Sequence, residues 1–244
     1  MLTSKISDII HSIRPENYHL IKTVALIVAH PDDETLWAGG TILNHPFWKC
    51  FIVCLCRGSD KERAPKFFET LKILNAGGIM GDLDDGPEQN PLDENDVEKA
   101  IMKLLPSTPF DLIITHNSTG EYTKHRRHEE TNKAVLSLWH NGKIKANELW
   151  TFAYEDGQKK YLPRAIKQAN YFQKLPEEIW VKKYKIITET YGFKKNSWEA
   201  KTTPTSEAFW LLKNRHKTKK TFHQYESNVK VSKIMIIKNL IQKW

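Results

Sequence analysis

The chain has 244 residues, and its 37 basic and 29 acidic side chains give a formal net charge of +8. This length can bury one sizeable α/β core, and hydrophobic and charged fractions of 40% and 27% argue against wholesale disorder. Residues 1–20 carry no uninterrupted apolar run with a small-residue cleavage site, so we expect no secretory signal there. No segment approaches the roughly 20 apolar residues of a membrane span, and we expect a cytoplasmic protein.

The basic excess is concentrated in the second half of the chain. Examples are Lys213, Arg215, Lys217, Lys219 and Lys220. Such a patch is typical of a solvated face, and it also suits an anionic small molecule, a nucleic acid or a membrane surface. Because no nucleic-acid-binding motif accompanies it, we expect no nucleic-acid partner. The sequence does not indicate an oligomeric state.

The cysteines Cys50, Cys54 and Cys56 fall in one short apolar run. In a strand, where side chains alternate with period two, they would share one face. A metal cluster is one interpretation, but ligands on one strand cannot easily surround an ion, and no histidine follows at finger-like spacing. We therefore expect buried, reduced cysteines that serve packing.

Near-continuous apolar runs rich in β-branched residues predict strands that are covered on both faces. In chain order they are residues 23–29, 51–56, 110–115 and 149–154. Helical patterns alternate with them at residues 34–43, 62–76, 93–105 and 127–139. This alternation predicts a Rossmann-like, doubly wound and mainly parallel sheet of the α/β class. Such a sheet binds ligands at the carboxyl ends of its strands.

The pattern weakens in the last third of the chain. The elements predicted there are helices at residues 162–171 and 177–190 and a loop at residues 196–204. Residues 229–243 form a basic amphipathic pattern, which is typical of a helix packed on its own domain and also of a helix on a membrane surface. We therefore predict a catalytic core over residues 1–160 and a helical C-terminal extension over residues 161–244, packed on the same domain.

The motif AHPDDE occupies residues 29–34, where the first predicted strand gives way to a helix. It places His30, Asp32 and Asp33 at the exposed end of an apolar strand. Packing alone does not explain such a cluster, because buried charge is costly unless it is paired or bound to a metal. The alternative is a turn in which Asp32 or Asp33 is the N-cap of the helix.

A second cluster of polar residues follows the strand at residues 110–115 and includes His116, His125 and His128. The last two are three residues apart at the entry to a helix, so they can face one cavity. A single histidine is more often exposed or hydrogen-bonded than a metal ligand, but two clusters at strand ends of one sheet favour a shared site. Two imidazoles and one carboxylate, with an open fourth position, are usual for catalytic zinc and also suit iron(II).

AHPDDE at the end of the first strand, with a downstream His-x-x-His at residues 125–128, resembles the PIG-L/LmbE-like superfamily of zinc-dependent de-N-acetylases. The resemblance covers roughly residues 20–155. It implies a Zn²⁺ cofactor whose ligands are His30, Asp33 and His128.

The same resemblance implies roles for further residues. Asp32 would be the general base that takes a proton from the metal-bound water. His125 would stabilise the oxyanion or protonate the leaving amine. The candidates for substrate contact are Arg57, Arg63, Asp84, Asp85 and Tyr122.

Two positions depart from the family pattern. Arg127 stands just before the last histidine, where the family usually has Asp or Asn, and Tyr122 lies three rather than two residues before His125. The three implied zinc ligands are retained. The changes bear on how neighbouring groups orient the ligands and on which substrate is bound.

From these residues we expect a zinc-dependent hydrolase that removes an N-acetyl group from an N-acetylglucosamine-type conjugate by metal-activated water. The basic excess hints that the conjugate is anionic. The alternatives are an amide hydrolase acting on a larger conjugate and a non-catalytic sugar- or nucleotide-binding module. The base beside the ligands argues against the binding module, and the chain has no glycine motif for dinucleotide or ATP binding.

Overall fold

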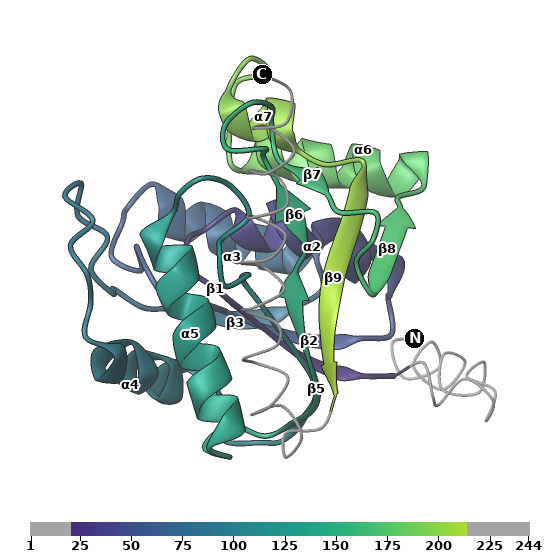
Figure 1. Cartoon of the computed structure of the whole chain (residues 1–244). Coiled ribbons are helices and arrows are strands. Elements are labelled where there is room, and N and C mark those ends of the chain that lie inside the picture. Colours follow the sequence, from purple (N-terminus) through teal and green to yellow (C-terminus); the bar gives the residue numbers. More distant parts are fainter. Residues whose placement is uncertain (1–20, 214–244) are drawn as a thin grey trace, which may run out of the picture.

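The computed structural model describes residues 21–213 of the chain. In this part a seven-stranded sheet forms the centre of the molecule (Figure 1). The strands, in their order across the sheet, are β3 (Gly77–Met80), β2 (Lys49–Cys54), β1 (Thr23–Val28), β4 (Phe110–Thr115), β5 (Ala146–Phe152), β9 (Ser206–Lys213) and β8 (Tyr171–Lys174). The first five are parallel to one another, whereas β9 and β8 are antiparallel to their neighbours. A separate two-stranded ribbon consists of β6 (Tyr154–Glu155) and β7 (Arg164–Ala165).

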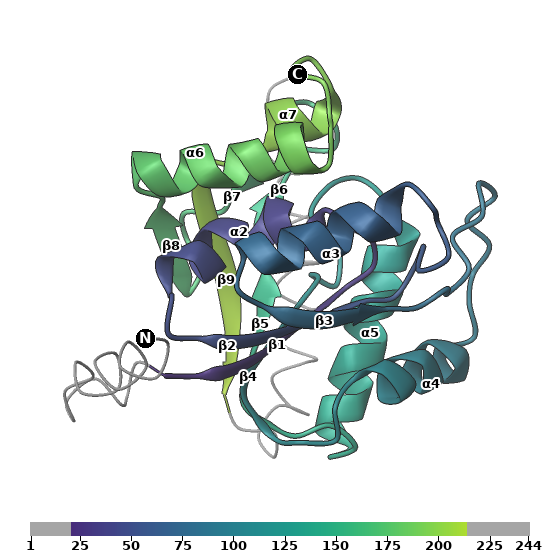
Figure 2. The ribbon, with the colours of Figure 1, turned by 180° about the vertical axis from the view of Figure 1, so that it is seen from behind.

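Helices cover both faces of the sheet, as Figures 1 and 2 show from opposite sides. The helices on the first face are α2 (Asp33–Asn44), α3 (Arg63–Ile73) and α6 (Glu177–Lys185), which continues into the π-helical turn η2 (Ile186–Thr190). The helices on the second face are α4 (Glu94–Leu104) and α5 (Arg126–His140). The short helix α7 (Trp198–Thr202) lies near the outer end of α6.

The central strand β1 shows why both faces need a cover. Val24, Leu26 and Val28 pack into the core beneath α2 and α3, while Ala25 and Ile27 pack into the core beneath α4 and α5. All five side chains are at most 1% exposed. The period-two alternation of a strand therefore divides one apolar run between two cores, which is the pattern of a buried parallel strand.

The predicted α/β class and mainly parallel sheet are confirmed, and the four predicted strands and four predicted helices of the first 160 residues exist with ends shifted by a few residues. The strand order reverses between β1 and β4, which lie side by side and lead to segments on opposite faces. A crevice at the carboxyl ends of these two strands is the usual ligand site of such a sheet. Both polar clusters of the sequence follow these two strands.

The sequence patterns missed three strands of the sheet. β3 is a short edge strand that begins at Gly77, directly after the predicted helix at residues 62–76. β8 and β9 return from the C-terminal part to extend the sheet beyond β5, in addition to the helices expected there. Their partners lie far along the chain, so local periodicity carries no signal of the pairing.

The helix predicted at residues 162–171 is wrong. Here β7 pairs with β6, and the backbone N–H of Ile166 donates to the carbonyl oxygen of Ala153 at 2.9 Å. This pairing overrides the weak helical pattern. The predicted loop at residues 196–204 contains α7, whose N-cap Ser197 accepts a hydrogen bond from the backbone N–H of Ala200 at 3.2 Å.

Other predictions fall wholly or partly beyond the described part of the chain. The amphipathic pattern at residues 229–243 and the basic residues from Arg215 to Lys220 lie outside residues 21–213. Within the described range, no helix combines the length and apolar character that would let it cross a bilayer.

All three cysteines are buried and free, as expected for packing residues. Their common orientation is wrong, however. Cys50 and Cys54 belong to the core beneath α2 and α3, whereas Cys56 lies beyond the end of β2 and packs into the core beneath α4 and α5. Burial raises the pKa of the Cys50 thiol to about 12, so it stays protonated at neutral pH.

A buried ion pair ties the C-terminal part to the helix α2. Lys183 of α6 and Glu207 of β9 are both fully buried, and their charged atoms lie 2.7 Å apart. Glu207 also accepts hydrogen bonds from the backbone N–H groups of Gly40 and Thr41 at 2.8 and 2.6 Å. The carboxylate is thus fully satisfied only while α2, α6 and β9 stay packed together.

We expect Lys183→Met to lower the free energy of unfolding by about 3–5 kcal/mol, because it leaves the buried Glu207 carboxylate without a counter-charge. Urea unfolding followed by circular dichroism measures this loss. Lys182→Met, at an exposed neighbouring position of α6, is the control and should change stability by less than about 0.5 kcal/mol. Equal stability of the two variants would show that the ion pair does not hold these elements together.

Candidate metal and active site

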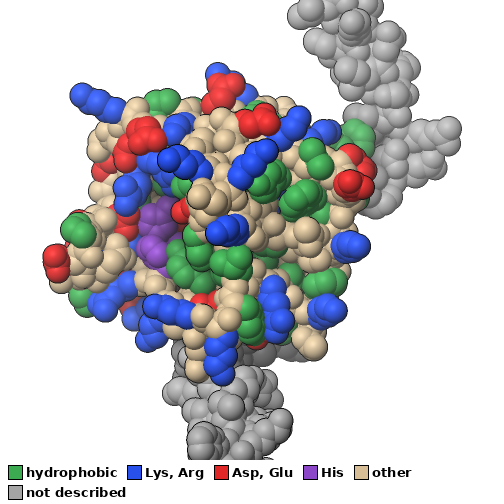
Figure 3. All heavy atoms as spheres, turned by 90° about the horizontal axis from the view of Figure 1, so that it is seen from above, with side chains coloured by type: hydrophobic (Ala, Val, Ile, Leu, Met, Phe, Trp, Pro, Cys, Tyr) green, Lys and Arg blue, Asp and Glu red, His purple; other side chains and the backbone are tan. Residues whose placement is uncertain are grey.

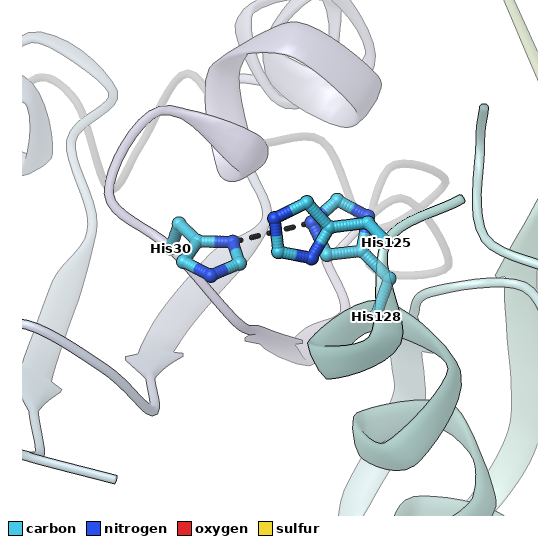
Figure 4. A group of neighbouring side chains, drawn as sticks. All are labelled: His30, His125 and His128. Atoms are coloured by element: carbon cyan, nitrogen blue, oxygen red, sulfur yellow. Dashed lines mark hydrogen bonds between the residues drawn. The ribbon is translucent and has the colours of Figure 1, made fainter. Parts of the chain in front are cut away.

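Two loops at the carboxyl ends of β1 and β4 bring the polar clusters of the sequence together. His30, Asp32 and Asp33 come from the turn between β1 and α2. His125 and His128 come from the start of α5, and Figure 4 shows their rings facing His30 across the gap between the two segments. Residues about 95 positions apart in the sequence therefore share one site.

Three ligand-type atoms converge at the centre of this site. The Nδ1 atom of His30 lies 3.2 Å from Oδ2 of Asp33 and 3.2 Å from Nε2 of His128. The Oδ2 atom of Asp33 and Nε2 of His128 are 3.3 Å apart. Ligands bound roughly 2.0–2.1 Å from a tetrahedral ion would be separated by about 3.3 Å. The three atoms are thus spaced as the ligands of one small metal ion are.

A carboxylate faces each ring nitrogen of His30 and His128: Asp33 lies on the inner side of both rings, and Asp85 and Glu121 lie on the outer side. In the tautomers that would bind a metal at the inner nitrogens, the Nε2–H group of His30 donates to Asp85 at 3.2 Å, and the Nδ1–H group of His128 donates to Glu121 at 2.6 Å. In the neutral rings, Nδ1 of His30 and Nε2 of His128 are then left with lone pairs. These lone pairs face each other and the Asp33 carboxylate, an arrangement that is repulsive unless a cation lies between them. The donor set therefore fits a divalent metal.

The electrostatic field of the site attracts positive charge. Burial lowers the pKa of His30, but the carboxylates of Asp33 and Asp85 outweigh this effect and raise it above its usual value. Burial likewise opposes ionisation of Asp33, but His128 and His116 hold the pKa of this carboxyl well below its usual range. A field that favours a proton on the imidazoles also favours a metal ion bound by them.

His116 and Glu121 support the ligands from behind. His116 is fully buried, accepts a hydrogen bond from the backbone N–H of Ala29 at its Nε2, and donates from Nδ1 to Glu121 at 2.9 Å. Glu121 thus accepts hydrogen bonds from both His116 and His128. Burial opposes its ionisation, but these two rings lower the pKa of Glu121 to about 2. The sequence analysis missed the role of Glu121, for which its place in a histidine-rich loop was the only signal.

Asp32 lies beside the ligand cluster in an unusual backbone conformation. Its φ of 112° falls in the left-handed region, which is uncommon for a residue other than glycine. Asp32 occupies the N-cap position of α2 without a capping hydrogen bond from its side chain, so capping does not explain it. Instead Oδ2 of Asp32 accepts a hydrogen bond from Arg63 at 2.7 Å. Burial and the nearby Asp33 raise the pKa of Asp32 to about 8, against the effect of Arg63.

Glu34, the last residue of the motif, holds this conformation in place. It is fully buried and accepts hydrogen bonds from the backbone N–H of Asp32 at 3.0 Å and from the Tyr191 hydroxyl at 2.8 Å. Its carboxylate thus links the turn that carries Asp32 to the C-terminal part of the chain. Such anchoring allows the strained turn to persist.

His125 lies over the ligand cluster on the pocket side. Its ring centroid is 4.5 Å from that of His30 and 4.4 Å from that of His128. Its Nδ1 atom is buried and has no hydrogen-bond partner among the described residues. Burial and the two neighbouring imidazoles lower the pKa of His125 to about 3, so its ring is neutral at pH 7.

The residues that were predicted to contact substrate differ in their partners and in whether they line the pocket. Arg57 is paired with Asp85 at 2.7 Å, and Asp85 in turn accepts the hydrogen bond from His30. Tyr122 lies over His128 with ring centroids 5.5 Å apart. The side chain of Asp84 points to Arg127, whose Nη2 lies 3.3 Å from it. Asp84 does not line the pocket that the other candidates share.

That pocket has a volume of about 550 Å³ and opens to the surface above the histidines. Figure 3 shows the histidine side chains in a hollow surrounded by basic, acidic and apolar side chains. Its wall includes Phe193, Trp198 and Glu199, which the sequence analysis did not single out. No local motif marks these three residues, and only the tertiary fold brings them to the site.

The fold and the site together define an α/β protein with a buried His-Asp-His cluster that fits a divalent metal. The family model of GlcNAc-PI de-N-acetylases, PIG-L, matches residues 25–139. The chain therefore carries a PIG-L family domain over these residues, and the family resemblance expected from AHPDDE is confirmed.

Several proteins of low sequence identity are similar to this chain. An uncharacterised protein of Acanthamoeba polyphaga mimivirus is 24% identical over 178 residues, which are 66% of this chain and 75% of the relative. The N,N'-diacetylchitobiose deacetylase from Pyrococcus horikoshii is similar with a TM-score of 0.59 and 15% identity, covering 87% of this chain and 93% of that structure. GalB, a 4-carboxy-2-hydroxymuconate hydratase from Pseudomonas putida, is similar with a TM-score of 0.55 and 16% identity, covering 79% and 97%. Since a deacetylase and a hydratase share this fold, the fold alone does not define the reaction.

We expect Glu121→Gln to weaken binding of Zn²⁺ or Co²⁺ by about 10- to 100-fold, because the neutral amide no longer holds His128 in its ligand tautomer. Competition with a chromogenic chelator measures the affinity. Glu129→Gln is the matched control, because the Glu129 side chain, also in the first turn of α5, makes no hydrogen bond or ion pair with the cluster within the described residues. Unchanged affinity in Glu121→Gln would remove this carboxylate from the support of the site.

Proposed function

We propose that the protein is a zinc-dependent N-deacetylase that hydrolyses the acetamide of an N-acetylglucosamine-type conjugate. The observation that carries the proposal is the cluster of His30 Nδ1, Asp33 Oδ2 and His128 Nε2, with Asp32 beside it in the same pocket. Two imidazoles and a carboxylate with an open side toward a pocket are the ligand set of hydrolytic zinc sites. The PIG-L family domain and the fold shared with a deacetylase support the choice of substrate bond.

In this proposal zinc would supply an acidified water and a Lewis acid for the amide carbonyl. Asp32 accepts the proton of the attacking water, for which a raised pKa near the working pH is suitable. Arg63 donates to Oδ2 of Asp32 and so fixes the direction of this carboxylate.

The family resemblance implies that His125 either stabilises the oxyanion or protonates the leaving amine, and in this proposal it stabilises the oxyanion. Because its ring is neutral at pH 7, it has one N–H group to donate to the oxygen that gains charge. The proton taken up by Asp32 is then available to the departing nitrogen. The products are acetate and a free amine, and no other co-substrate is needed.

The experiment that tests the proposal combines metal analysis with product analysis. Purified wild-type protein and His30→Ala are compared for zinc content and for acetate released from N-acetylglucosamine conjugates. Near-stoichiometric zinc in the wild type alone, together with acetate release, is the expected result. Zinc without acetate would favour an amide hydrolase acting on a larger conjugate. Absence of zinc from both proteins would contradict the proposal and favour a binding module.

We expect Asp32→Asn to retain zinc but to lose on the order of 10²-fold or more in the rate of acetate release, because the amide cannot accept the proton. Asparagine tolerates a positive φ, so the turn should be preserved. Inductively coupled plasma mass spectrometry and an acetate assay measure the two effects. Loss of the metal together with the activity would instead assign Asp32 to metal binding, and full activity would remove it from the mechanism.

A further inference from the structure

The outer wall of the pocket comes from the C-terminal part of the chain. Trp198 and Glu199 of α7 and Phe193 line the same cavity as His30, Asp32 and His125. These wall residues lie outside residues 25–139, which the family model matches. Any selectivity that they confer therefore comes from residues beyond the matched domain.

Trp198 is unusually exposed for a residue of its size. Its exposed fraction is 37%, although it lines a cavity beside the fully buried Trp37 and the partly buried Tyr122. Tyr122 meets it at a ring distance of 4.8 Å and an angle of 62°, and Trp37 at 6.5 Å and 66°. Neither ring lies flat on the indole. The indole thus offers a platform to a ligand rather than stacking face to face with one of these two neighbours.

Glu199, next to it in sequence, is the second element of this wall. It is partly buried, and its carboxylate makes no ion pair or hydrogen bond with another residue of the described part of the chain. The other charged groups of the wall are already engaged, since Arg57 is paired with Asp85 and Arg63 with Asp32, each at 2.7 Å. A carboxylate accepts hydrogen bonds only, so it suits hydroxyl donors and repels phosphate.

We propose that Trp198 and Glu199 form a subsite for an uncharged pyranose ring of the substrate. The apolar C–H face of the ring packs on the indole, and ring hydroxyls donate hydrogen bonds to Glu199. This subsite rests on the proposed deacetylation of an amino sugar and deepens it. It also replaces the expectation of an anionic conjugate, because the cationic groups of this wall are paired and the unpaired group is a carboxylate.

A cationic ligand is the competing occupant, since a carboxylate beside aromatic rings also attracts ammonium groups. Binding of a cation in an aromatic cage uses several ring faces around one point. Here Tyr122 and Trp37 approach Trp198 at steep angles, so the geometry is that of one platform. A pyranose ring, with its apolar C–H face and several hydroxyls, uses both the indole face and the carboxylate acceptor.

The test compares kcat and KM for acetate release from N,N'-diacetylchitobiose by the zinc-loaded full chain. Trp198→Ala should raise KM on the order of tenfold while kcat changes by less than about twofold, and Trp198→Phe should restore most of the affinity. Glu199→Gln should raise KM by a smaller factor. Phe172→Ala is the control, because Phe172 is equally exposed at 37% but does not line the pocket.

A direct measurement of sugar binding tests the subsite independently of the proposed reaction. Calorimetric titration with the same disaccharide should show weaker binding in Trp198→Ala than in the wild type, whether or not acetate is released. If Trp198→Ala binds the disaccharide more weakly but the wild type releases no acetate, the subsite is supported and the proposed deacetylase activity is contradicted. Equal affinity of wild type and Trp198→Ala, or a fall in kcat alone, would overturn the subsite. Selective loss of N-acetylputrescine binding in Glu199→Gln would overturn it in favour of a cation site.

Discussion

The structure depends on the convergence of three electron-pair donors that would repel one another if left alone. In the metal-binding tautomers, Asp85 and Glu121 accept the outward N–H groups of His30 and His128, and the lone pairs of both rings point toward Asp33. Such an arrangement is stable only within a rigid frame and is relieved by a cation. The buried ends of β1 and α5 supply that frame, because their backbones are fixed by a sheet and a helix that are packed on both sides.

Arg127, which departs from the family pattern, has its place in this frame. Its side chain is fully buried, donates to the backbone carbonyl of Asp84 at 2.5 Å and pairs with Glu130 at 2.6 Å. It therefore ties the start of α5 to the loop that carries Asp85. Since Asp85 orients His30 and α5 carries His128, the guanidinium holds two ligand supports at a fixed separation.

The sequence predicted that the residues after β1 and after β4 would meet, and there is a physical reason for this. The ligand candidates stand at strand ends, and parallel strands bring their carboxyl ends together whatever the details of packing. Whether Asp85 would face substrate or His30 depends on the path of one loop, which composition does not encode. In the same way β9 pairs with β5 across about 60 residues, so neither its existence nor the position of α7 could be derived from local periodicity.

The C-terminal part of the chain restrains the proposed base and also forms one wall of the pocket. The Tyr191 hydroxyl donates to Glu34, and Glu34 holds the backbone of Asp32. The Arg63 guanidinium, which orients the Asp32 carboxylate, lies 4.9 Å from the ring of Phe193 and 5.7 Å from that of Tyr191. The segment that places Trp198 and Glu199 at the pocket mouth therefore also restrains the proposed base. One segment thus serves both ends of the pocket through different residues, since Tyr191 and Phe193 contact the groups that restrain the proposed base, and Trp198 and Glu199 form the proposed sugar subsite.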